Sequence, residues 1–295
     1  MLWAIFALLG AVLDAGYYAL VKRSLASLED EVIAAGTFLS SSAILLAISL
    51  LKGIPPLGPS LVPLVIATGT LNVIAAFLVY DALRRTDLSL AVPVITFTLV
   101  FLVGTSFLLL GEVPTAAGAA GILLIVSGAI LMHTMGGRSG FLHPIVNIVR
   151  DRGVMVMLVV AFLYSLSLPF DKAVVLASDT IFGSSLVLCF IGIVFLTVSL
   201  ARGSFRRAPA AIALPLCLGL GLVLSLEAIA INIAYTLQIV PYVIAVKRLS
   251  ILFSVLIGGI VFREEGIRYR ILGALIMIGG VALIVLTTVP EPILS

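Results

Sequence analysis

Residues 226–265 read LEAIAINIAYTLQIVPYVIAVKRLSILFSVLIGGIVFREE. The run is almost entirely apolar, yet Glu227, Lys247 and Arg248 lie inside it. A charged side chain near the centre of a bilayer costs about 2.5–3.5 kcal/mol on insertion scales, so such residues are kept where they face protein, water or a ligand. We therefore interpret this stretch as two membrane-spanning helices that present charged side chains to a polar path.

The composition of the whole chain agrees with a lipid environment. Apolar residues make up 62% of the 295 residues and charged residues only 11%. A soluble domain has roughly 25% charged and under 50% apolar residues. The first residues, MLWAIFALLG, lack the basic region and the small-residue cleavage site of a signal peptide, so we expect them to begin the first span. Cys189 and Cys217 lie in apolar runs without metal-like spacing and are predicted to be free thiols.

A helix needs about 20 apolar residues to cross a hydrocarbon core of about 30 Å. Ten segments meet this requirement: 2–21, 31–51, 61–83, 88–110, 114–133, 153–173, 179–200, 210–236, 240–262 and 268–288. Most links between them are a few residues long, so consecutive spans are expected to be antiparallel neighbours. The fold predicted is an all-α membrane protein with ten transmembrane helices.

The two halves of the chain carry matching residues in the same order. Glu112 and Glu264 are 152 residues apart, Lys22 and Lys172 are 150 apart, and several glycines and aromatic residues repeat at similar offsets. The pattern predicts one five-helix repeat over 1–133, a connecting loop over 134–152 and a second repeat over 153–295. An odd number of spans inserts the second copy upside down, and such inverted repeats place a site at mid-membrane between the halves.

The basic residues predict the orientation in the membrane. The odd-numbered loops contain thirteen Lys and Arg residues, whereas the even-numbered loops contain only Lys52 and Lys172. By the positive-inside rule the odd loops are cytoplasmic, so both termini are expected to face outside.

Local patterns in this ten-span arrangement resemble a known family. Ala91-Val92-Pro93 in span four, Gly111-Glu112 at its end and residues 246–265 in span nine look like the EamA type of the drug/metabolite transporter superfamily. Matching glycines in spans five and ten agree with it, namely Gly121, Gly128, Gly273 and Gly280. The resemblance implies a helical carrier in which spans one, three, four, six, eight and nine surround a central cavity. Members move amino acids, sugars, nucleotide sugars or other small metabolites, often outward.

Polar residues on span nine form one predicted wall of that cavity. Lys247, Ser250, Ser254 and Gly258 recur every three or four residues and share a helical face. This face can bind an anionic group, or Lys247 can instead extend to the interface while the serines pack against another helix. Arg248 is turned by about 100° on a regular helix, so the two cations are not expected on the same face, and one of them is expected in a structural ion pair.

Glu227 lies about 14 Å from the end of span eight by helix rise, close to the depth of Lys247. The two side chains are therefore expected to face a shared polar cavity and to be energetically coupled. A static ion pair and a proton-coupled carboxylate both remain open for Glu227. Asn72 is the residue at the matching position of the first repeat and would hydrogen-bond without charge.

Asp14 is placed near the middle of span one, with Tyr17 and Tyr18 on nearly the same face. A carboxylate at mid-membrane is a functional-site hypothesis by default, although it can also bond a neighbouring helix. Asp171 and Lys172 end span six and are predicted to be interfacial residues.

The remaining predicted site residues are aromatic or break the helix. Tyr80, Tyr164 and Tyr235 are expected in the cavity wall or in the interfacial aromatic belt. Pro93, followed by Thr96, frees a backbone carbonyl and can act as a hinge in span four.

These features together predict a secondary active transporter rather than an enzyme. We expect an exporter of a small polar metabolite such as an amino acid, which works by alternating access. A proton is the candidate coupling ion. It would lie in the plasma membrane of a prokaryote as a monomer or homodimer, without metal, cofactor or nucleic acid. The alternatives are an intramembrane enzyme or flippase acting on a lipid-linked substrate, and a structural or sensory scaffold. The sequence lacks a Walker A loop and an H-E-x-x-H motif.

Overall fold

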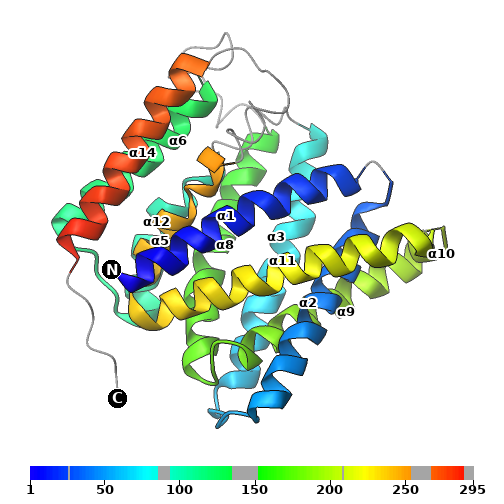
Figure 1. The fold of residues 1–295 in the computed structure, drawn as a ribbon. Coiled ribbons are helices and arrows are strands. Elements are labelled where there is room, and N and C mark those ends of the chain that lie inside the picture. Colours follow the sequence, from blue (N-terminus) through cyan, green and yellow to red (C-terminus); the bar gives the residue numbers. More distant parts are fainter. Residues whose placement is uncertain (26, 86–93, 135–151, 208, 254–266, 289–295) are drawn as a thin grey trace.

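The protein is described by a computed structural model that covers residues 1–25, 27–85, 94–134, 152–207, 209–253 and 267–288. Within these ranges all regular structure is helical (Figure 1). The helices are α1 (Leu2–Ser24), α2 (Asp30–Lys52), α3 (Leu61–Arg85), α5 (Thr98–Leu110), α6 (Ala116–Thr134), α8 (Arg152–Leu176), α9 (Phe182–Arg202), α10 (Ser204–Arg207), α11 (Ala210–Leu237), α12 (Val240–Lys247) and α14 (Ile267–Thr287).

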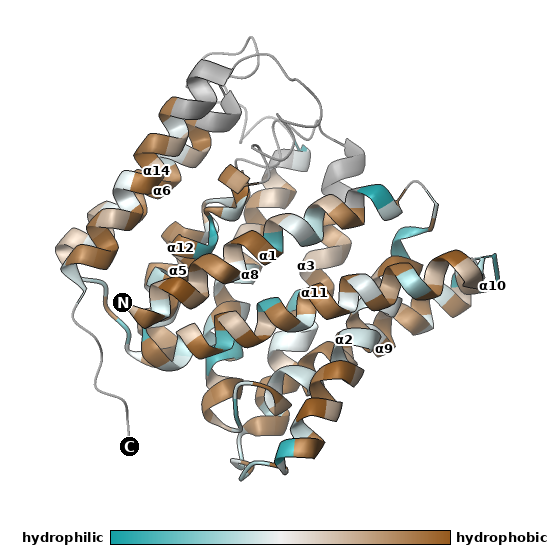
Figure 2. Cartoon of the chain, in the orientation of Figure 1, coloured by the Kyte–Doolittle hydropathy of each residue, from teal (hydrophilic) through white to brown (hydrophobic). Residues whose placement is uncertain are grey.

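Each of the ten predicted segments overlaps one of these helices, and the prediction of an all-α membrane protein is confirmed. Among the described helices, α1, α2, α3, α8, α9 and α11 are long and apolar enough to cross a membrane. The helices α5, α6 and α14 are shorter but also apolar. Apolar residues cover much of the outer surface (Figure 2), and large ones such as Leu51 and Leu108 are exposed by 89% and 79%. This surface suits lipid rather than water.

The helices pair in a pattern that is unchanged when the two halves are exchanged. The closest pairs are α6 with α14, α2 with α9, α3 with α8, and α1 with α11. Exchanging the halves replaces every helix by the helix five spans away. The α1–α11 pair then becomes the α8–α3 pair, whereas the α6–α14 and α2–α9 pairs are unchanged. An inverted repeat produces such a pattern. The division into 1–133, 134–152 and 153–295 stays a prediction, since nearly all of the connecting segment lies outside the described residues.

Spans four and nine contain the same local break in their hydrogen bonding. The N–H of Phe97 donates to the carbonyl of Val94 (3.1 Å), and the N–H of Leu249 donates to the carbonyl of Val246 (3.0 Å). Both bonds join residues three apart, as in a 3₁₀ turn. The two breaks are 152 residues apart, which is the offset of the sequence repeat. Residues at both breaks line the cavity described below.

The pair α6–α14 packs through glycines. A Cβ atom built on Gly280 would lie 2.6 Å from the carbonyl oxygen of Gly121, and one built on Gly121 would lie 2.7 Å from that of Gly280. The two backbones therefore approach as closely as glycine allows. The neighbouring Gly279 has no atom within 4 Å of its Cβ position and is not part of this contact.

Burial of α12 fixes the position of the site. Residues Val240 to Val246 are all buried, and a proline lies in the first turn of the helix. The helix contacts α1, α5, α6, α8, α11 and α14. Because every face of α12 is covered, its last residue, Lys247, is placed within the protein interior rather than at a lipid-facing surface.

Candidate functional site

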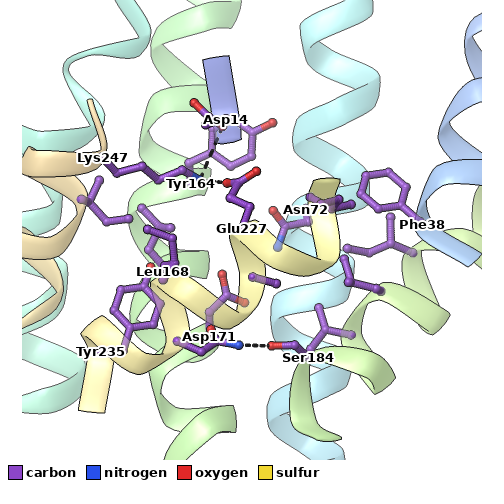
Figure 3. A pocket seen from close by; sticks show the side chains of 18 of the residues that line it. Asp14, Phe38, Asn72, Tyr164, Leu168, Asp171, Ser184, Glu227, Tyr235 and Lys247 are labelled. Carbon is purple, nitrogen blue, oxygen red and sulfur yellow. Dashed lines mark hydrogen bonds and ion pairs between the residues drawn. The ribbon is translucent and has the colours of Figure 1, made fainter. Parts of the chain in front are cut away.

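A cavity of about 330 Å³ lies among α1, α3, α8, α9, α11 and α12 (Figure 3). These are spans one, three, six, seven, eight and nine, and Ile95 adds a contact from span four. The expected set of six spans is therefore present around the cavity. Span seven also contributes, and α2 provides Phe38, which the expectation had left out. Both halves of the chain form the walls.

Three charged side chains from three helices meet in this cavity. The Nζ atom of Lys247 lies 2.6 Å from Oε1 of Glu227 and 3.7 Å from Oδ1 of Asp14, as the dashed lines of Figure 3 show. Glu227 is 5% exposed and its side chain is the most buried of the three. The predicted meeting of Lys247 and Glu227 is thus observed, while their energetic coupling stays a prediction. One cation between two carboxylates leaves this group with a formal charge of −1.

Arg248 also lines the cavity, although a regular helix would have turned it away from the face of Lys247. The prediction that the two cations occupy different faces is wrong because α12 ends at Lys247 and the chain turns at Arg248. The Nε atom of Arg248 is buried and has no hydrogen-bond partner, and the ion pairs of the described residues do not include its guanidinium.

A polar network joins α3 to α8 across from the charged triad. Thr68 donates a hydrogen bond to Oδ1 of Asp171 (2.5 Å), and Asn72 donates to Oγ of Ser167 (2.8 Å) and to Oγ1 of Thr68 (3.2 Å). The pairs 68/72 and 167/171 are each four residues apart, so they share one face of their helix. Asn72 and Glu227, which occupy matching positions of the two repeats, both line the cavity.

Asp171 and Lys172 do not lie at an interface, contrary to the prediction. The helix α8 continues to Leu176, so both residues lie inside it. Asp171 lines the cavity, and Lys172 is buried at 7% exposure. Lys172 is therefore a helix residue and not a loop residue. Of the two basic residues that were counted in the even-numbered loops, only Lys52 remains, so the excess of basic residues in the odd-numbered loops is larger.

Lys172 belongs to a second buried ion pair next to the cavity. Its Nζ atom lies 2.5 Å from Oε1 of Glu112 and donates to the carbonyl of Gln238 (3.0 Å). The other carboxylate oxygen of Glu112 accepts hydrogen bonds from Oγ of Ser106 (2.5 Å) and from the N–H of Val240 (2.8 Å). This cluster joins the end of α5 to α8 and to the link between α11 and α12.

Most of the predicted site residues come together in the cavity. Those that line it are Asp14, Tyr18, Asn72, Tyr164, Glu227, Tyr235, Lys247, Arg248 and Ser250. Their placement is observed, and their role in binding stays a prediction.

The other five predicted residues have different outcomes. Tyr17 is not in the cavity lining and packs by its edge on the neighbouring tyrosine, with ring centroids 5.7 Å apart. Thr96 is buried at the break in span four but does not line the cavity. Pro93 and Ser254 lie outside the described residues, as does the side chain of Tyr80.

Several cavity residues were missed by the sequence analysis. Asp171 was assigned to an interface, and Asn232, Ser184, Phe38 and Phe195 were not considered. Asn232 lies five residues after Glu227 in the same span. A polar residue within an apolar run could have indicated that it faces the cavity. The phenylalanines gave none, since aromatic residues are common in every span.

Residues 1–134 match the model of the EamA-like transporter family. The amino-terminal half of this chain is EamA-like. The resemblance predicted from sequence is therefore confirmed over this part of the chain, and the long apolar helices agree with an integral, multi-pass membrane protein. The chain is also similar in fold to a solved crystal structure of a protein, with a TM-score of 0.78. The two share 16% identity over 97% of this chain and 99% of the other. No curated protein matches the chain.

Proposed function

We propose that this EamA-like protein is a secondary active transporter that exports a small polar metabolite, such as an amino acid or a related compound. The observation that carries the proposal is the cavity itself, which lies between the two halves and has ionisable groups of both signs on its walls. Lys247 and Arg248 suit a carboxylate, and the carboxylates suit an ammonium group. The fold alone would not favour one class of substrate over another.

The size of the cavity supports a free metabolite over a lipid-linked substrate. Its volume of about 330 Å³ is at the lower end of the range of roughly 300–1,000 Å³ found for small-molecule sites. A lipid-linked sugar would need a longer groove that is open to the bilayer. A flippase or an intramembrane enzyme is therefore the weaker alternative.

The breaks in spans four and nine support alternating access. Ile95 lies at one break, and Lys247 and Arg248 lie at the other, and all three line the cavity. A change of backbone angles at these turns would move the adjoining helical segments past the cavity, as hinges do in other transporters. Matched breaks in the two halves would let the cavity open to one side of the membrane and then to the other.

Ion coupling is proposed to run through the triad. Lys247 is shared by two carboxylates, so a proton taken up by either one would weaken its hold on the cation and change the charge of the cavity. The proposed setting is the prokaryotic plasma membrane with both termini outside, and the unit is a monomer or homodimer.

The proposal is tested by solute counterflow in proteoliposomes. The purified protein is reconstituted with one unlabelled amino acid inside, and uptake of the same radiolabelled amino acid is followed, for each amino acid in turn. We expect exchange of at least one of them, loss of exchange with Lys247→Met and normal exchange with Gly279→Ala, a control at an exposed glycine with open space beside it. Absence of exchange by folded wild-type protein, together with movement of a fluorescent lipid-linked sugar, would favour the flippase.

A further inference from the structure

We propose that Asp171 holds a cationic group of the transported substrate and makes the cavity selective for compounds that carry an ammonium or similar positive charge. This inference rests on the proposed transport function and assigns the charge of the substrate. It concerns a residue that lies on α8, apart from the Asp14–Glu227–Lys247 triad (Figure 3).

The first argument is the unmatched charge of Asp171. Its Oδ1 atom accepts a hydrogen bond from Thr68 (2.5 Å). The described residues place no Lys or Arg nitrogen within ion-pair distance of its carboxylate, and they give Oδ2 no hydrogen-bond donor. The neighbouring Lys172 is engaged with Glu112 on another side of α8.

The second argument is the charge of the cavity as a whole. Its described lining contains three carboxylates and two cations, and Lys247 is already shared by two of those carboxylates. The described lining therefore carries a formal charge of −1. An uncompensated charge in a low-dielectric site is costly, so a substrate that brings a positive charge is favoured over one that brings a negative charge.

The third argument is a second, independent acceptor in the same cavity. Asn232 is 4% exposed, and its Nδ2 atom donates to the carbonyl of Thr180 (2.7 Å) and to Oγ of Ser184 (2.6 Å). Both protons of the amide are therefore used, which fixes the orientation of the side chain and leaves Oδ1 as an acceptor. The described residues donate no hydrogen bond to this oxygen. An ammonium group has three donors, and such acceptors match it.

The experiment uses matched triplets of probes in the counterflow assay and in thermal unfolding in detergent. Each triplet presents one side chain as the amino acid, as its methyl ester (a cation without carboxylate) and as the 2-hydroxy acid (an anion without amine). We expect the first two to raise the melting temperature and the hydroxy acid to have no effect. Asp171→Asn should weaken binding of the amines by about tenfold or more, as for loss of a charged hydrogen-bond partner. Asp179→Asn, outside the cavity, should bind normally.

Each other result has a definite meaning. If the hydroxy acid is bound and exchanged as well as the amino acid, or if Asp171→Asn binds amines normally, Asp171 does not hold the cationic group, while the transport function stands. If no member of any triplet is exchanged or shifts the melting temperature, the proposed function itself fails. If Asp171→Asn does not fold, Asp171→Ser, which also removes the negative charge, gives the same comparison.

The second buried pair carries an independent inference. We infer that the Glu112–Lys172 pair is a latch that closes the end of the cavity at which α8 ends. Glu112 follows α5 in the first half, and Lys172 belongs to the second half, so the pair ties the two halves together. Each residue is about 8% exposed, and Ser106 and the N–H of Val240 complete the bonds of Glu112. Neither residue of the pair lines the cavity, but Lys172 directly follows the lining residue Asp171 on α8.

The latch predicts a change in access to the cavity. In a background with Cys189→Ser and Cys217→Ser, Ala228→Cys places a thiol in the cavity wall. Glu112→Gln should raise the rate at which a membrane-impermeant maleimide labels this thiol from the side of the latch by severalfold.

Two controls make the result decisive. Arg202→Gln, which breaks the exposed Arg202–Glu31 pair instead, should leave the labelling rate unchanged. An unchanged rate in both folded Glu112→Gln and folded Lys172→Met would show that the pair is only structural. Equal acceleration by Arg202→Gln would show general loosening and would also overturn the latch.

Discussion

Removal of single members of the charged triad should destabilise the protein in a defined order. Lys247→Met leaves two carboxylates, the partly buried Asp14 and the buried Glu227, without their cation. Glu227→Gln leaves Lys247 with Asp14 still 3.7 Å away. The double variant leaves one lone carboxylate. We therefore expect Lys247→Met to be the worst of the three, worse than the double variant, with Glu227→Gln the mildest.

The size of the effect follows from the geometry. At an effective dielectric constant near 20, unit charges 2.6 Å apart attract by about 6 kcal/mol, and charges 3.7 Å apart by about 4.5 kcal/mol. Desolvation of the charges offsets most of this attraction. Loss of one partner of a buried pair typically costs about 3–5 kcal/mol, and we assign this cost to Lys247→Met. Glu227→Gln should cost about 1–3 kcal/mol, as for an altered buried hydrogen bond.

The assay is reversible denaturant unfolding of the purified variants in one detergent, with transport measured on the same preparations. Lys52→Met is the matched control, since Lys52 is the exposed last residue of α2. Stabilities that are simply additive, or three variants that behave as wild type, would refute energetic coupling. If Glu227→Gln retains binding but loses pH-driven uptake, the carboxylate is the proton site rather than a static partner.

Three further predictions concern packing, hydrogen bonding and orientation. Gly280→Ala should lower stability by about 1–3 kcal/mol because its Cβ meets the backbone of α6, whereas Gly279→Ala, with open space, should be neutral or slightly stabilising in thermal unfolding. Tyr242→Phe should cost about 1–3 kcal/mol in the same assay, since its hydroxyl accepts from the N–H of Thr115 at 2.8 Å and that N–H would lose its partner. A reporter that is active only in the cytoplasm should stay silent when fused to the carboxyl terminus, and a strong signal would reverse the orientation.

The sequence by itself determined the class of the protein and the positions of its helices. A membrane span is set by length and hydropathy, which are local properties, so the ten segments could be read without knowledge of packing. The repeat was readable for the same reason, because the offset of 152 residues between Glu112 and Glu264 needs only residue identities. The depth of Lys247 and Glu227 follows from helix rise, which is why their meeting was predicted.

The tertiary structure decided which polar groups share the cavity. Asp14 reaches Lys247 because α1 packs against α12 as well as along α11, a choice among neighbours that no local pattern fixes. Asp171 lines the cavity because α8 packs along α3 with Asp171 beside Thr68, and the sequence does not show which face of α8 this packing covers. Arg248 joins Lys247 because the chain turns where an ideal helix was assumed. Helical periodicity predicts on which side of its own helix a side chain lies. The contacts of a site depend in addition on where several helices end and how they are rotated against one another.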